Sequence, residues 1–176
     1  MDTGAKEADE MSTVTYSGVD PGKNGAIASV DAAGEIIRIT RFRDAETEGR
    51  IGLVIADHFA ALPPSSYHAC SIERVGAMPR QGLSSTFTFG RVYGEALSAI
   101  LLSNARMSLT RPQTWQRELG LPKRDEYAAH KRAIKEAAES RWSRRFVLAE
   151  VDALWIAEHA RRFGSWRFNT EGPADE

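Results

Sequence analysis

The 176-residue sequence has little cysteine and no long apolar run. Its single cysteine, Cys70, cannot form an internal disulfide, which excludes a disulfide scaffold and suits a reducing compartment. No stretch reaches the roughly 18 to 20 apolar residues that span a bilayer, and the polar, acidic start of the chain lacks the apolar core of a signal peptide. These absences predict a cytoplasmic protein with no membrane partner.

Net charge is also nearly absent, at −1, which by itself argues against a nucleic-acid-binding protein. The charge is, however, unevenly distributed. Residues 1–15 carry one Lys against four acids and residues 171–176 carry three acids, whereas residues 76–145 carry 13 Lys or Arg against 6 Asp or Glu, about +7. Binding to phosphates requires such a positive stretch, although a solvated helical face has the same composition.

Hydrophobic periodicity predicts one α/β domain over residues 13–164, between a loose acidic arm (1–12) and a polar tail (165–176). Strands are predicted at 13–20, 25–31, 35–42, 67–75 and 106–110; helices are predicted at 51–62, 87–103, around Trp115, at 125–141 and at 151–163. Short connections make the first three strands an antiparallel meander, and two crossovers extend it. The main elements thus follow the order βββαβαβαα, a mixed five-stranded sheet with helices on both faces.

Three acids stand where this sheet can bring them together. Asp20 ends the first strand, Glu73 lies late in the fourth, and Asp152 opens the last helix. A right-handed crossover lays the fourth strand parallel to the first, so both strand carboxylates reach the same edge. Each acid alone has an ordinary interpretation: Asp20 as a turn residue, Glu73 as an ion pair with Arg74, and Asp152 as a helix N-terminal acid.

Together, the three carboxylates predict a divalent metal site. Converging carboxylates repel one another, and Mg²⁺, which prefers oxygen ligands, relieves that repulsion. Two such ions can activate a water and stabilise the leaving oxygen during phosphodiester hydrolysis.

Five motifs in register resemble those of a known family. They are Gly18-Val19-Asp20-Pro21-Gly22 with Gly25, Ile72-Glu73, residues 85–94 (STFTFGRVYG), Pro112-Gln113-Thr114-Trp115, and residues 152–158 (DALWIAE). Their order is similar to that of RuvC-like Holliday junction resolvases, which have the RNase H-like fold. Phage members are especially similar, including the loop from Met78-Pro79 to Gly82.

The resemblance implies a homodimeric endonuclease that nicks two opposed strands of a four-way DNA junction. It implies two Mg²⁺ or Mn²⁺ ions on Asp20, Glu73 and Asp152, and no small-molecule cofactor. Family members place a fourth ligand where this chain has Ala149, which leaves Glu150 as a candidate replacement. Glu158, nearly two turns beyond Asp152, is expected at the surface.

Two further departures concern DNA. The family's base-stacking aromatic residue falls at Gly76, which leaves Met78 as the candidate wedge. A family lysine falls at Glu126, so Lys123, Arg124 or Lys131 is expected to supply that charge. The candidate phosphate contacts, each also explicable as an ordinary surface charge, are Arg80, Arg91, Lys123, Arg124, Lys131, Arg132 and Lys135.

Two other functions remain open at this point. A nuclease of the same fold that cuts flaps, other branched DNA or RNA–DNA hybrids shares the same acids. A non-catalytic DNA-binding module on this fold is compatible with Ala149. The residues do not identify the cleavage sequence, the strictness of junction selection or the source, bacterium or phage.

Overall fold

The computed structural model describes residues 14–22, 24–44, 50–64, 67–76 and 82–164. The predicted arm and tail, with Met78 and Arg80, lie outside these residues. In chain order the elements are β1 (Val14–Asp20), β2 (Ala26–Val30), β3 (Ile36–Arg41), a 3₁₀ turn η1 (Phe42–Asp44), α1 (Ile51–Ala60), β4 (Tyr67–Glu73), α2 (Leu83–Leu102), β5 (Arg106–Thr110), α3 (Pro112–Glu118), α4 (Tyr127–Trp142) and α5 (Leu148–Phe163).

The five strands form one mixed sheet in the order β3-β2-β1-β4-β5. The pairs β1–β2 and β2–β3 are antiparallel, as expected for a meander with short turns. The pairs β1–β4 and β4–β5 are parallel, because each connection crosses over through a helix. The predicted mixed five-stranded sheet is therefore confirmed.

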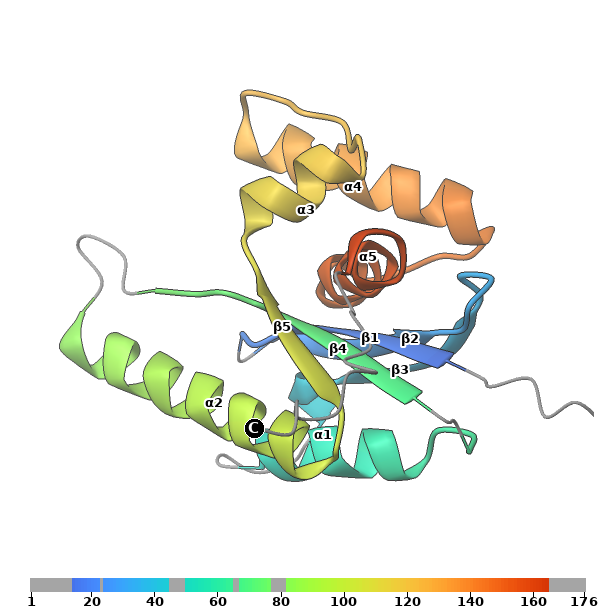
Figure 1. Ribbon diagram of the computed structural model, residues 1–176. Coiled ribbons are helices and arrows are strands. Elements are labelled where there is room, and N and C mark those ends of the chain that lie inside the picture. The colour runs from blue at the N-terminus through green and yellow to red at the C-terminus, as the bar shows by residue number, and fades with distance from the viewer. Residues whose placement is uncertain (1–13, 23, 45–49, 65–66, 77–81, 165–176) are drawn as a thin grey trace, which may run out of the picture.

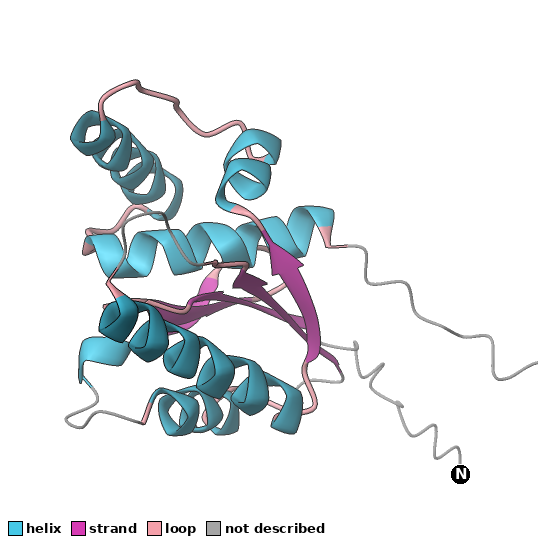
Figure 2. Cartoon of the chain, turned by 90° about the vertical axis from the view of Figure 1, so that its left-hand side faces the viewer, coloured by secondary structure: helices cyan, strands magenta, loops and turns pink. Residues whose placement is uncertain are grey.

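Helices cover both faces of the sheet (Figures 1 and 2). Helices α1 and α2 lie on one face, and α5 lies on the other, against β1 and β2. Helices α3 and α4 pack on α5 from the far side, so α5 is enclosed between the sheet and a third layer. Within the described residues, no helix has both the length and the apolar character needed to cross a membrane.

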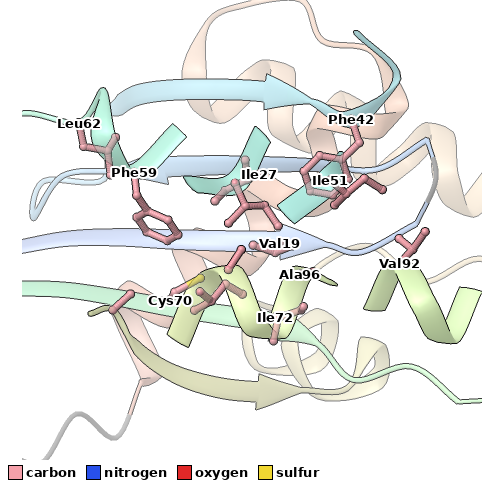
Figure 3. Packing of buried hydrophobic residues seen from close by; sticks show 14 residues of the cluster. Val19, Ile27, Phe42, Ile51, Phe59, Leu62, Cys70, Ile72, Val92 and Ala96 are labelled. Carbon is pink, nitrogen blue, oxygen red and sulfur yellow. The ribbon is translucent and has the colours of Figure 1, made fainter. Parts of the chain in front are cut away.

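Each face of the sheet has its own hydrophobic core. Val19, Ile27, Cys70 and Ile72 point toward α1 and α2 (Figure 3). The alternate residues Ala26, Ala28 and Val30 of β2 belong to the core beneath α5. Alternation places successive side chains on opposite faces. Complete burial of each Ile contributes roughly 1.5–3 kcal/mol.

A chain of buried polar side chains runs through the α1 face. Ser17 Oγ lies 2.7 Å from Ser29 Oγ, which lies 2.8 Å from His58 Nε2. Thr40 Oγ1 lies 2.8 Å from His58 Nδ1. Burial, with a smaller contribution from the charge of Arg38, lowers the pKa of His58 to about 3. The imidazole is therefore neutral and holds two strands to α1 through hydrogen bonds.

Two helices begin earlier than the sequence predicts. Helix α2 begins at Leu83 rather than residue 87, and Thr86 Oγ1 donates to the Gly82 carbonyl at 3.1 Å. Helix α5 begins at Leu148 rather than residue 151, so Asp152 lies one turn inside it instead of opening it. Apolar periodicity misses such first turns when polar or exposed residues form them.

Candidate active site

Asp20 and Glu73 end neighbouring parallel strands. Val19 pairs with Ile72, so Asp20 and Glu73 follow on the same rung of the β1–β4 ladder. Val19 and Ile72 point toward α1 and α2. Because side chains alternate, Asp20 and Glu73 belong to the opposite face, the one that α5 covers.

A close contact between the backbones of α5 and β1 positions the third acid, Asp152. A Cβ atom on Gly18 would lie 2.2 Å from the Ala157 nitrogen and 2.3 Å from the Ala153 oxygen, so only glycine fits here. This contact lays the helix backbone directly on the strand. Asp152 immediately precedes Ala153, so the contact that requires Gly18 also brings Asp152 to the end of β1.

A tight turn fixes Asp20 from the other side. A Cβ on Gly25 would lie 2.0 Å from the Asp20 carbonyl oxygen, and the Gly25 N–H donates to the Gly22 carbonyl at 2.8 Å. The Gly22 N–H donates to Asp20 Oδ1 at 3.2 Å. The glycines of the first motif therefore position the Asp20 carboxylate.

The three carboxylates influence one another electrostatically. Burial raises the pKa of Asp20, and repulsion from Asp152 raises it further. Burial, followed by repulsion from Asp20, raises the pKa of Glu73 to about 7. The charge of Asp152 raises the pKa of both strand carboxyls, so the three acids are near enough to repel one another.

Lys131 of α4 partly offsets the negative charge of the three acids, because it forms an ion pair with Asp152 Oδ2. Burial lowers the pKa of Lys131, but the Asp152 carboxylate outweighs that effect and the net shift is upward. The other Asp152 oxygen, Oδ1, is buried without a hydrogen-bond partner. One ammonium group therefore faces a cluster of acids whose charges it does not balance.

The indole of Trp115 orients the remaining acid. Its Nε1–H donates to Glu73 Oε1 at 3.2 Å, and the ring itself is buried. This bond lowers the pKa of Glu73, against the larger effect of burial. Trp115 therefore favours the ionised carboxylate and restricts its rotation.

As the side chains stand, no group of three or more His, Cys, Asp or Glu in the described part of the chain is arranged to hold a metal ion. Lys131 already engages Asp152 Oδ2. The donor chemistry nevertheless fits a hard divalent cation, because the cluster offers carboxylate oxygens, mutual repulsion and the unpartnered Asp152 Oδ1.

Glu150, the candidate fourth ligand, has a structural contact. Its Oε2 accepts a hydrogen bond from the Val147 N–H at 3.1 Å and so caps the start of α5. A metal role for Glu150 would require it to leave this cap. Ala149, at the usual fourth-ligand position, lines the groove beside Asp20 and Asp152.

Open grooves flank the acids on two sides. One, of about 810 Å³, contains Asp20 and Asp152; its basic lining residues are Arg43, Lys131, Arg132 and Lys135. The other, of about 670 Å³, contains Glu73 with Arg74 and Arg111. The acids therefore lie between two cation-lined depressions, an arrangement suited to a polyanion that crosses the sheet edge.

The predicted phosphate contacts occupy different places. Lys131, Arg132 and Lys135 line the groove at Asp152, as a DNA-binding role requires. Lys123 and Arg124 line a separate pocket near the start of α4. Arg91 lies on α2, across the sheet from α4, where its guanidinium contacts Glu95 Oε1 at 2.5 Å.

Sequence reasoning did not select Arg74, Arg111 or Trp115 as site residues. Thr110 pairs with Glu73 across β4 and β5, so Arg111 follows the strand at the same edge as the acids. That register was the available signal for Arg111. The contact between Trp115 and Glu73 joins residues 42 positions apart, and no local pattern predicts it.

Comparison with known proteins supports the fold. Neither a protein-family model nor a curated protein sequence matches this chain. The structure belongs to the α/β class and has the mixed sheet of the RNase H-like fold. Within that class the fold is RuvC-like, which confirms the resemblance inferred from the motifs.

The likeness to a RuvC-like fold rests on two solved structures. A Thermus thermophilus RuvC in complex with a Holliday junction substrate superposes with a TM-score of 0.61 at 17% identity, covering 86% of this chain and 97% of that chain. A second Thermus thermophilus RuvC structure superposes with a TM-score of 0.58 at 16% identity, covering 85% and 93%. At such low identity the likeness shows the fold alone.

Proposed function

We propose that this chain is a metal-dependent endonuclease that resolves four-way DNA junctions by paired nicking. The observation that carries the proposal is the gathering of Asp20, Glu73 and Asp152, from three separate elements, between two cation-lined grooves. Half-buried carboxylates that repel one another destabilise a fold unless a cation offsets their charge, and such clusters are therefore typical of functional sites. The RuvC-like fold supports the choice of DNA as the substrate class.

In this proposal Asp20, Glu73 and Asp152 hold Mg²⁺ or Mn²⁺, with two ions per site. Bound divalent ions supply an activated water and stabilise charge on the phosphate and the leaving oxygen. The Trp115 indole holds Glu73 in position. Arg74, Arg111, Arg132 and Lys135 position the DNA backbone without reading its sequence.

Lys131 acts as a counter-charge to the carboxylate cluster through its ion pair with Asp152. Its ammonium is paired with Asp152 and lines the groove where the DNA backbone would lie. When the carboxylates receive another cation, the ammonium becomes available to a phosphate oxygen in the same groove. The proposal therefore gives Lys131 a role in both states.

Neutralising one acid at a time tests the site. Asp20→Asn, Glu73→Gln and Asp152→Asn are each expected to reduce Mg²⁺-dependent nicking of a mobile four-way junction by roughly 10³-fold or more, because each removes a ligand and a charge. Junction binding in a gel-shift assay should persist, because phosphate contacts remain. Nicking should also fall steeply with added salt.

Asp57→Asn on α1 and Glu136→Gln on α4 are matched controls, because both acids are exposed. They should nick like the wild type. Wild-type rates in all three site variants would remove Asp20, Glu73 and Asp152 from the chemistry. Absence of nicking from the wild type itself, with binding intact, would favour the non-catalytic module.

Substrate selection is tested side by side on a four-way junction, a flap and an RNA–DNA hybrid. The proposal expects the junction to be nicked fastest, with symmetric cuts on opposed strands. Faster cleavage of the hybrid would assign the site to a ribonuclease, and faster cleavage of the flap would assign it to a general branched-DNA nuclease.

Paired nicking needs two active sites, and we propose that α2 forms the homodimer contact. One face of α2 exposes Leu83 and Phe87, which are 91% and 75% exposed, with Leu101 at 60% near its other end. Gly90 and Gly94 lie between them at helical spacing, and a Cβ on either would meet nothing within 4 Å. An apolar stripe with small residues at its centre suits close packing against a second helix.

Phe87→Glu is expected to convert the dimer into a monomer, because it places a charge in the apolar contact. Light scattering at micromolar concentration measures the mass. Leu53→Glu is the matched control, since Leu53 is 59% exposed on α1 and lies outside the stripe. A wild type that is monomeric with and without DNA would exclude paired cleavage through this contact.

A further inference from the structure

A pocket of about 570 Å³ lies between α3, the following loop and the first turns of α4. Its lining combines an apolar surface at Gly120 and Leu121 with a surround of polar side chains. The polar lining residues are Gln113, Gln116, Arg117, Lys123, Arg124 and His130. The pocket is separate from the carboxylate cluster, and the chemistry proposed above does not use it.

Gln113 connects the pocket to the candidate active site. It lines both this pocket and the groove that contains Glu73. Pro112 begins α3 directly after β5, whose last residue, Thr110, pairs with Glu73. Gln113 therefore borders both depressions, and a chain molecule that occupies one can extend into the other.

The pocket presents hydrogen-bonding edges as well as charge. Gln116 Oε1 lies 3.3 Å from His130 Nε2, which leaves the Gln116 amide NH₂ as a donor. His130 Nδ1 is buried without a partner. Side-chain amides pair with the edges of nucleobases, and Gln matches adenine with two hydrogen bonds.

The charges around the pocket fit the same ligand. Arg117, Lys123 and Arg124 are exposed and supply contacts for phosphates on either side of a base. An acidic peptide would also satisfy these three cations. It would not require the paired amides and the imidazole, and it would have no reason to extend to Glu73.

We propose that this pocket holds one nucleobase of the cut strand, next to the scissile phosphate, and that Gln113 and Gln116 select it, with adenine preferred. The inference rests on the proposed nuclease function and adds a sequence preference to it. Phosphate contacts set where the strand lies, and the pocket then decides which positions along a mobile junction are nicked.

The test uses four-way junctions in which the base pairs around the exchange point are randomised, with the nicks located by sequencing. The wild type should prefer one base at one position by about tenfold. Gln113→Ala and Gln116→Ala should each reduce that preference ratio at least about fivefold, whatever their total rate. Ser140→Ala, at an exposed position toward the other end of α4, should keep the wild-type ratio.

A second measurement does not depend on cleavage. Junctions carrying 8-vinyladenine, a fluorescent adenine analogue that keeps the 6-amino group and N7, at successive positions are bound without metal, and base entry into the pocket should change the emission at one position. Gln116→Ala should remove that change, and Ser140→Ala should retain it.

The outcomes separate the two claims. Nicking without base preference, or an unchanged preference in both glutamine variants, overturns the pocket and leaves the nuclease intact. Complete absence of nicking removes the nuclease, and the 8-vinyladenine signal then decides the pocket alone. An equal emission change in the wild type and in Gln116→Ala also overturns it.

Discussion

Two groups of buried or half-buried polar side chains in the described part of the chain lie on opposite faces of the sheet, and they differ in how far hydrogen bonds and counter-charges satisfy them. On the α1 face, Ser17, Ser29, His58 and Thr40 form a continuous hydrogen-bonded chain without a net charge. On the α5 face, three carboxylates share one ammonium group, and the Asp152 Oδ1 atom has no partner.

The difference distinguishes a polar network whose hydrogen bonds are satisfied from a group of carboxylates whose charges are not balanced. Satisfied buried polar groups stabilise a particular packing arrangement. Charged groups left unbalanced cost free energy unless a ligand completes them. The first group should therefore affect stability more than activity, and the second should affect activity more than stability.

The largest stability effect is expected from His58→Leu. The substitution removes the imidazole partner of the buried Ser29 hydroxyl and of the half-buried Thr40 hydroxyl, so unfolding free energy should fall by roughly 2–4 kcal/mol. Urea denaturation measures the change, and Asp57→Asn, exposed on the same helix, is the control. Nicking per folded molecule should remain normal. An unaltered midpoint would mean that the chain of hydroxyls does not depend on His58.

A smaller effect should appear when the pH is lowered. The pKa of His58 is about 3 in the folded protein, below its ordinary value of 6.5. Its contribution to stability is therefore present above pH 6.5 and is lost as the pH falls toward 3. Between pH 7.5 and 5 that loss amounts to about 2 kcal/mol.

The titration of Glu73 changes the stability of the fold in the opposite direction over part of this pH range. Its contribution is present below its ordinary pKa of 4.5 and is lost as the pH rises through about 7. Both the wild type and His58→Leu contain Glu73. Subtracting the unfolding free energy of the variant from that of the wild type at each pH therefore cancels the contribution of Glu73. Denaturant titrations at several pH values measure both profiles, and parallel profiles would contradict a buried neutral His58.

The smallest effect, and one of opposite sign, is expected for Asp20→Asn without divalent ions. Removing one carboxylate relieves its burial and its repulsion by Asp152, so the variant should be more stable than the wild type by about 1 kcal/mol. Mg²⁺ at ten times its dissociation constant should then stabilise the wild type by about 1.4 kcal/mol and the variant much less.

Thermal melts with and without Mg²⁺ measure this crossover. The Asp57→Asn control should follow the wild type in both conditions. If Asp20→Asn is less stable than the wild type without metal, the carboxylate cluster is a structural network like that of His58, and the contrast between the two faces disappears.

Local sequence patterns predicted most of the framework. The strand over residues 106–110 was predicted with its observed bounds, because Arg111-Pro112 mark its end. The glycines around Asp20 and the position of Glu73 late in a strand predicted that the two acids meet, because parallel strands end at the same edge. The beginnings of α2 and α5 were placed too late, because their first turns lack apolar periodicity.

Glu158 shows where sequence reasoning was wrong. It was expected at the surface, but its side chain is buried and both carboxylate oxygens accept from Arg161 at 2.7 Å. A helix with a sheet on one side and two further helices on the other has few exposed positions. The pattern within α5 could not reveal this third layer, because α3 and α4 reach it through contacts distant in sequence.

The amino-acid sequence alone predicted the three-strand meander and the fourth strand parallel to the first, and so that Asp20 and Glu73 reach one sheet edge, because alternation and crossover handedness follow general rules. The register that aligns Val19 with Ile72 came from the structure. Tertiary structure alone decided that Lys131 pairs with Asp152, that Trp115 binds Glu73 and that His58 joins two strands to α1. Each of these contacts joins residues at least 18 positions apart. Their geometry depends on how helices pack on the sheet, and no periodicity along the chain encodes that packing.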